Sequence, residues 1–133
     1  MPSLLPLIAA VAAAALYAGI VAFQLALAAG VPWGRAAYGG QRDDLPASMR
    51  VSSGVAAVLW AGFALIVLRR VGLVGWAPLP DAWLPAAVWV AAALAGLSVV
   101  LNAITRSRIE RAIWLPASVL LLAATLALAL TAG

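Results

Sequence analysis

The stretch "LPLIAAVAAAALYAGIVAFQLALAA", residues 5 to 29, contains no acidic or basic residue and is long enough to cross a membrane. About 20 helical residues span the hydrocarbon core of a bilayer. Three more apolar runs follow near residues 46–68, 83–104 and 114–131. Because hydrocarbon offers no water to unpaired backbone groups, we expect each run to be a helix. The sequence therefore predicts an all-α fold, a four-helix transmembrane bundle that forms one integral membrane domain over residues 1–133.

The composition of the chain agrees with lipid as its solvent. Of its 133 residues, 67% are hydrophobic and 9% are charged, whereas a soluble domain is about half apolar and about a quarter charged. The chain has no cysteine and no histidine, which excludes thiolate and imidazole zinc sites and every catalytic triad that needs histidine. No spacing of its acids matches a known catalytic motif. We therefore predict no catalytic residue, no metal site and no cofactor, and the leading expectation is a non-enzymatic protein. A lipid-modifying enzyme stays open as another class, and it would need Glu110 or the Asp43/Asp44 pair close to a cavity open to headgroups.

The arginines set the expected orientation. All eight basic residues are arginines, and they lie at the ends of the apolar runs. The first and third loops carry Arg35, Arg42, Arg50, Arg106, Arg108 and Arg111, whereas the second loop carries Arg69 and Arg70. The positive-inside rule places the six-arginine side in the cytoplasm, so both termini are expected outside (N-out/C-out) in a multi-pass protein of the plasma membrane. The net charge of +4 then reflects contact with membrane lipids and not with nucleic acid.

A Leu-Pro pair marks the head of each apolar run, at Leu5-Pro6, Leu45-Pro46, Leu84-Pro85 and Leu115-Pro116. Proline suits the first turn of a helix because its missing N–H would be unpaired there. Ser107 and Glu110, however, fit an S-x-x-E capping box ahead of the last pair. The fourth helix therefore begins either near Arg108 or at Pro116, and both starts stay open.

The first loop reads "GVPWGRAAYGGQRDD", residues 30 to 44. Trp33 and Tyr38 are typical of the aromatic belt at a membrane surface, and Gly39 and Gly40 permit the positive φ angles of a sharp turn. One interpretation is an anchored interfacial loop whose arginines reach lipid phosphates or the neighbouring acids. A second is that Gly39 and Gly40 supply backbone N–H groups, with Arg42 beside them, for a phosphate or a carboxylate.

The third loop, "NAITRSRIERAIWLP", residues 102 to 116, holds a second polar set. Asn102 and Thr105 lie about one helical turn apart near the inner end of the third run. Glu110 can pair with an arginine of its own loop or with Arg50 across the gap. Two interpretations stay open: charges that cap helices and reach the interface, or residues that line one cytoplasmic-facing polar pocket together with the first loop.

These two loops resemble a family of small bacterial four-span membrane proteins that has no established activity. Its pattern is a Gly-x-Pro-Trp-Gly loop followed by Gly-Gly, Leu-Pro and Arg, and then Asn-x-x-Thr-x-Ser-x-x-Glu-Arg-x-x-Trp-x-Pro. The matching positions are Gly30, Pro32, Trp33, Gly34, Gly39, Gly40, Leu45, Pro46, Arg50, Asn102, Thr105, Ser107, Glu110, Arg111, Trp114 and Pro116. Arg106 departs from the pattern, in which a proline follows the threonine. The resemblance implies a bacterial four-span fold and no particular reaction.

We expect a non-enzymatic membrane protein whose polar and aromatic cytoplasmic face contacts lipid headgroups, a small amphipathic ligand or a protein partner. The contact residues predicted on that face are Trp33, Gly34, Tyr38, Gly39, Gly40, Arg42, Arg50, Asn102, Thr105, Glu110, Arg111 and Trp114. The alternative is a small transporter or channel in which several copies of the chain line the path. No charged residue lies near the centre of a run, which argues against proton-coupled transport through a membrane-embedded carboxylate. Expected partners are membrane lipids, and a membrane-protein partner or further copies of the chain.

Overall fold

Four long helices account for most of the fold. The computed structural model describes residues 4–40 and 42–132, and over these residues it contains helices and no strand. The long helices are α1 (Leu5–Ala28), α2 (Ala47–Arg70), α3 (Leu84–Ile104) and α4 (Arg108–Thr131), and the short 3-10 turns are η1 (Gly34–Ala36), η2 (Tyr38–Gly40) and η3 (Asp81–Trp83). Each long helix is apolar and long enough to span a membrane. The all-α, four-span fold expected from the sequence is therefore confirmed.

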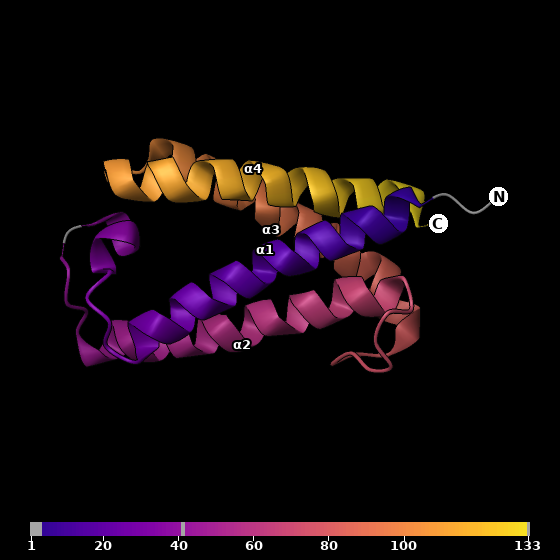
Figure 1. Ribbon diagram of the computed structural model, residues 1–133, viewed down its shortest axis with the longest axis horizontal. Helices are drawn as coiled ribbons and strands as arrows, with labels where there is room; N and C mark the ends of the chain where they lie inside the picture. The colour runs from indigo at the N-terminus through magenta and orange to yellow at the C-terminus, as the bar shows by residue number, and fades with distance from the viewer. Residues whose placement is uncertain (1–3, 41, 133) are drawn as a thin grey trace.

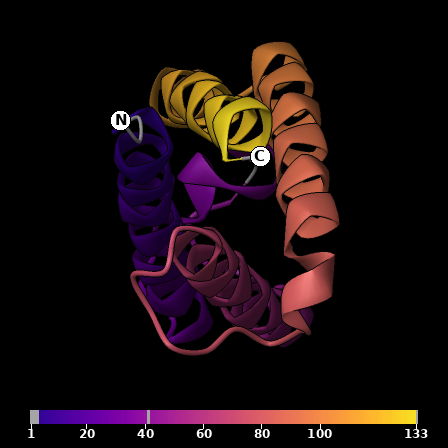
Figure 2. The same cartoon turned by 90° about the vertical axis from the view of Figure 1, so that its right-hand side faces the viewer.

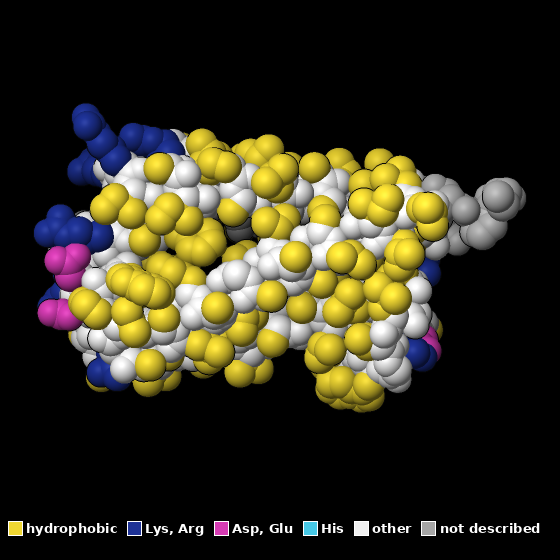
Figure 3. All heavy atoms as spheres, in the orientation of Figure 1, with side chains coloured by type: hydrophobic (Ala, Val, Ile, Leu, Met, Phe, Trp, Pro, Cys, Tyr) yellow, Lys and Arg dark blue, Asp and Glu magenta, His cyan; other side chains and the backbone are white. Residues whose placement is uncertain are grey.

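The helices form two antiparallel hairpins, α1 with α2 and α3 with α4, and α1 also packs against α4 (Figure 1). In the view along the bundle, the four helices surround a central region, and the turns η1 and η2 lie behind it at the far end of the bundle (Figure 2). Both ends of the described chain lie at one end of the bundle, and the α1–α2 and α3–α4 loops lie at the other (Figure 1). We name the latter the loop end. It holds the two loops that carry most of the arginines (Figure 3).

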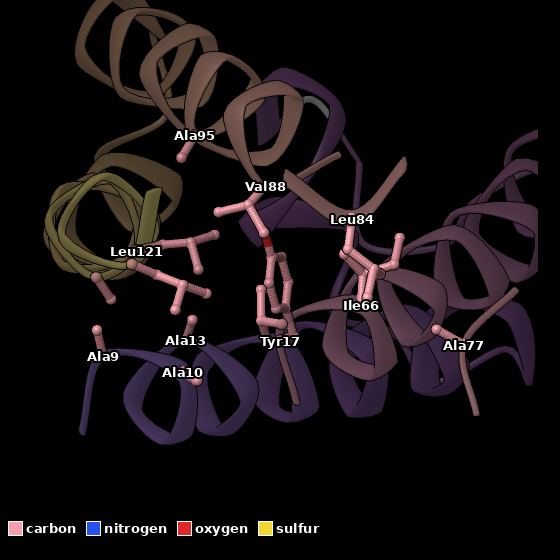
Figure 4. Packing of buried hydrophobic residues seen from close by; sticks show 13 residues of the cluster. Ala9, Ala10, Ala13, Tyr17, Ile66, Ala77, Leu84, Val88, Ala95 and Leu121 are labelled. Atoms are coloured by element: carbon pink, nitrogen blue, oxygen red, sulfur yellow. The ribbon is translucent and has the colours of Figure 1, made fainter. Parts of the chain in front are cut away.

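The buried side chains of α1 are small near its start and include an aromatic ring further along. Near its start, the small buried residues Ala9, Ala10 and Ala13 bring α1 close to α4, as small side chains do in packed membrane helices. Further along, Tyr17 is fully buried and stacks on Trp60 and Phe63 of α2, with ring centroids 5.8 and 6.1 Å apart. Tyr17 extends from α1 toward Val88 of α3 (Figure 4). From this aromatic level to the loop end, α1 follows α2 and diverges from α4 (Figure 1).

The outer faces of the helices are strongly apolar. Val58 is 72% exposed, Ile104 70% and Leu130 66%, and hydrophobic side chains cover the visible long sides of the molecule (Figure 3). Such a belt is too large for a monomeric protein surrounded by water. It matches the hydrocarbon of a bilayer, which supports a multi-pass membrane protein.

The start of α4 is at Arg108. Ser107 occupies the N-cap position, and its Oγ accepts a hydrogen bond from the Glu110 amide at 3.1 Å. The span expected from residue 114 is therefore too short at its beginning, because the cap adds the preceding residues to the helix. Pro116 lies inside α4. Of the two starts left open for the fourth helix, the structure has the one at Arg108. In the first three helices the Leu-Pro pair lies at the helix start or just before it.

At the opposite end of the bundle, two arginines of α2 form hydrogen bonds with the α2–α3 loop and with the end of α4. The guanidinium of Arg69 donates to both carboxylate oxygens of Asp81, at 3.1 and 2.9 Å, and to the Val74 carbonyl at 3.2 Å. Arg70 donates to the carbonyl of Ala132 at 2.8 Å. These contacts join the α2–α3 loop and the end of α4 to the end of α2, away from the site described next.

Candidate functional site

The first loop closes on itself at the loop end. The Gly34 amide donates to the Asp43 carbonyl at 2.9 Å, and Arg35 forms an ion pair with the Asp43 side chain at 2.8 Å. A Cβ at Gly34 would overlap the carbonyl oxygens of Arg42 and Asp43. Only glycine fits where the two segments of the loop, at Gly34 and at Asp43, approach this closely. We name η1 and η2 together, residues 34–40, the lid.

Three hydrogen bonds fix the lid to α4. The hydroxyl of Ser107 donates to the Arg35 carbonyl at 2.8 Å, and the indole N–H of Trp114 donates to the Ala36 carbonyl at 2.8 Å. The Gly39 amide donates to Oε2 of Glu110 at 3.0 Å. All three bonds use main-chain groups of the lid, so they hold its backbone and not merely a side chain.

The contact between lid and α4 depends on glycine. Gly40 has a φ of +71°, and a Cβ built there would lie 2.5 Å from both Cβ and Oγ of Ser107. Gly39 has a similar φ of +79°, but nothing would meet its Cβ within 4 Å. The Gly-Gly pair therefore serves two needs: a left-handed backbone at both residues and, at Gly40 alone, close approach to α4.

Tyr38 fixes the lid to α2. Its backbone has a φ of +50°, which is uncommon for a residue with a side chain. Its hydroxyl donates to the Met49 carbonyl at 3.1 Å or shares a hydrogen bond with Oγ of Ser53 at 2.9 Å. Ser53 is fully buried. The lid thus joins the two hairpins where α1 and α4 diverge.

A cavity of about 360 Å³ lies beneath the lid. This volume is within the usual range for sites that bind small molecules. The surface is hollowed between α1 and α4 on this part of the molecule (Figure 3). The cavity is lined by residues of all four helices and of the lid: Ile20, Phe23, Gln24, Ala36, Ala37, Tyr38, Ser52, Ala56, Trp60, Ser98, Asn102, Glu110, Trp114, Ala117, Ser118 and Leu121.

Some polar groups of the cavity wall have hydrogen-bond partners within the chain and others have none among the described residues. The Asn102 amide donates to the Trp114 carbonyl at 3.3 Å and to Oγ of Ser118 at 3.4 Å, which joins α3 to α4. Oε1 of Gln24 is buried and has no hydrogen-bond partner among the described residues. Buried polar atoms are nearly always paired. Gln24 is therefore a lining residue whose side-chain oxygen is buried without a partner among the described residues.

Within the described chain, Glu110 forms none of the ion pairs that the sequence made possible for it. Among the described residues it forms no ion pair; the two ion pairs found there are Arg35–Asp43 and Arg69–Asp81. Nor does its carboxylate complete the capping box, because it accepts from Gly39 while the Ser107 amide donates to Oγ1 of Thr105 at 3.3 Å. The anion beside the Gly-Gly pair is thus the chain's own glutamate.

Of the twelve contact residues expected from the sequence, the structure brings four to the cavity wall: Tyr38, Asn102, Glu110 and Trp114. Gly34, Gly39 and Gly40 build the lid. Trp33 is 54% exposed and stacks on Phe23, with centroids 6.4 Å apart.

The remaining four residues are Thr105 and three arginines, and each forms a hydrogen bond with a backbone group. Oγ1 of Thr105 accepts from the Ser107 amide at 3.3 Å. Arg42 donates to the Asp44 carbonyl at 3.0 Å and Arg50 to the Ala28 carbonyl at 3.1 Å. Arg111 donates to the Thr105 carbonyl at 2.9 Å, just after the end of α3. These arginines terminate helices and brace loops, and none lines the cavity.

Phe23, Gln24, Ser52, Trp60, Ser98 and Ser118 line the cavity but were not expected from the sequence. One signal was available: Gln24, Ser52 and Ser98 are polar residues in the half of each apolar run nearest the loop end. Over residues 4–40 and 42–132, no group of three or more His, Cys, Asp or Glu side chains could hold a metal ion. Comparison of the chain with protein-family models, with curated proteins and with solved structures gives no match.

Proposed function

We propose that this chain is a binding protein of the plasma membrane that holds a small amphipathic molecule in the cavity beneath the lid. The observation that carries the proposal is the cavity itself, of about 360 Å³, with aromatic and polar walls inside an otherwise apolar bundle. Convergent polar groups in a largely apolar concavity are typical of small-molecule sites.

The walls favour a molecule with a polar head and an apolar tail. Glu110, Asn102 and Tyr38 lie at or near the lid, whereas Ile20 and Leu121 lie deeper in the bundle. The hollow between α1 and α4 opens on the apolar side of the molecule (Figure 3). A head beneath the lid and a tail toward the bilayer would satisfy both regions.

The proposed orientation places the loop end in the cytoplasm and both termini outside. The support is the arginine distribution, six residues at the loop end against two at the other, together with the positive-inside rule. The exposed arginines would contact the phosphates of the inner leaflet. The loop motifs resemble those of small bacterial four-span proteins, which supports a bacterial plasma membrane.

Native mass spectrometry tests the proposal on full-length protein extracted in mild detergent. The wild type is expected to keep a bound amphiphile, and Ala56→Phe, which fills the cavity wall, is expected to lose it. Ala93→Phe is the matched control, because Ala93 faces outward on α3.

Three results would contradict the proposal: no adduct on the wild type, equal adducts on both variants, or loss from Ala93→Phe alone. Flux through reconstituted liposomes that Ala56→Phe leaves unchanged would instead favour a path lined by several copies.

A further inference from the structure

We infer that the head of the bound amphiphile is positively charged, of the alkylammonium class. The inference rests on the proposed function and names its ligand chemistry. It starts from the charge of the cavity wall. Glu110 is the one charged residue among the lining residues. No arginine lines the cavity, although six arginines lie at the loop end of the bundle.

The charge of Glu110 is not neutralised within the described chain. It forms no ion pair there, and the hydrogen bond it receives, from the Gly39 amide at 3.0 Å, goes to Oε2. Glu110 is partly buried, so its attraction for a cation is screened less than that of a fully solvated carboxylate. The second oxygen, Oε1, accepts no hydrogen bond from a described residue and can face a ligand.

The aromatic walls point to the same chemistry. Phe23, Trp60 and Trp114 come from three different helices and line the one cavity, with Tyr38 of the lid. Phe23 and Trp114 pack edge to face, with centroids 4.8 Å apart. A cation over an aromatic face is attracted by the ring quadrupole, and cages of such rings recognise quaternary ammonium groups.

An anionic head finds no comparable partner. The Gly39 amide, which could receive a phosphate, already donates to Glu110. Arg35 pairs with Asp43 and keeps 62% of its side chain exposed, and Arg111 donates to a backbone carbonyl. These arginines instead give the loop end a positive charge, which repels a cation that approaches from water. A cationic amphiphile would therefore enter from the bilayer, through the hollow between α1 and α4.

Calorimetric titration of the purified full-length protein in dodecyl maltoside tests the inference. The probes are octyltrimethylammonium, octyl sulfate and octyl glucoside, which share a tail and differ in head charge. We expect wild type to bind the ammonium probe at least tenfold more tightly than the sulfate. Glu110→Gln keeps an oxygen for the Gly39 amide but removes the charge, and is expected to weaken ammonium binding about tenfold, or about 1.4 kcal/mol.

In Glu110→Gln the ratio of ammonium affinity to glucoside affinity should fall about tenfold. Asp81→Asn, which removes a carboxylate at the opposite end, should bind all three probes as wild type does. Phe23→Leu provides a second test in case Glu110→Gln does not fold, with a several-fold loss for the ammonium probe alone. Equal wild-type binding of ammonium and sulfate, or unchanged ammonium binding by Glu110→Gln, would overturn the inference while glucoside binding upholds the proposed function. No binding of any probe would overturn both.

Discussion

The backbone amide of Gly39 and the carboxylate of Glu110 meet at 3.0 Å, although the two residues stand 71 positions apart in the chain. This hydrogen bond joins the loop between α1 and α2 to the first turn of α4. It gives the glutamate of the S-x-x-E motif a partner in the lid in place of the Ser107 amide. With the bonds from Ser107 and Trp114, it closes the loop end over the cavity.

The two tyrosines should respond in opposite ways to loss of the hydroxyl. Tyr38→Phe removes the bonds to Met49 and to buried Ser53, and should destabilise the protein by about 1–2 kcal/mol. Tyr17→Phe removes a buried hydroxyl that has no partner among the described residues, and should be neutral or stabilise by about 1 kcal/mol. Unfolding in mixed micelles measures both. A larger loss for Tyr17→Phe than for Tyr38→Phe would refute the lid geometry.

The two neighbouring glycines should differ when each becomes alanine. Both have positive φ angles, so each substitution carries a strain of about 1 kcal/mol. Gly40→Ala also drives a methyl group into Ser107, and should lower stability by a further 1–3 kcal/mol, roughly the cost of overpacking. Gly39→Ala is the matched control. Equal melting temperatures for the two variants would show that the lid does not rest against α4.

Ser107 should matter more than an exposed serine at another helix start. Ser107→Ala removes the cap of α4 and the bond to the Arg35 carbonyl, and a loss of about 1–2 kcal/mol is expected. Ser48→Ala, on the exposed first turn of α2, should change stability by less than about 0.5 kcal/mol. Hydrogen exchange of the lid amides should rise only in the Ser107 variant. If both serines prove equivalent, α4 does not begin at this cap.

The number of helices follows from the sequence because the length of an apolar run is a physical requirement of the bilayer. The start of α4 at Arg108 does not follow from the apolar run, which begins near residue 114; it depends on the Ser107 cap. The partner of Glu110 does not follow, since an S-x-x-E motif ordinarily returns its glutamate to the cap and only the folded lid supplies the competing Gly39 amide. The sequence also did not predict which face of each helix points into the bundle. Helices apolar on every side give no periodic signal, so Gln24 and Ser98 could be assigned a depth but not a direction.

The proposed orientation can be checked with single cysteines, because the natural chain has none. Cysteines replacing Ser48 and Ile109, both exposed near the loop end, should react with an impermeant maleimide only from the cytoplasmic side. A cysteine replacing Gly75, in the α2–α3 loop, should react only from outside. Labelling of positions 48 and 109 from opposite sides would contradict the four-span arrangement, and reversed labelling of all three would contradict the orientation alone.

The most direct test of the central claim is to map where a membrane amphiphile lies on the protein. An octylammonium probe with a photoreactive group in its tail would be crosslinked in membranes that contain the full-length chain, and the modified residues identified by mass spectrometry. The account predicts adducts of the tail on Ile20 of α1 and on Ala117 and Leu121 of α4, removed by excess octyltrimethylammonium. Adducts spread over outward-facing residues such as Val58 and Val90, and not displaced by competitor, would contradict it.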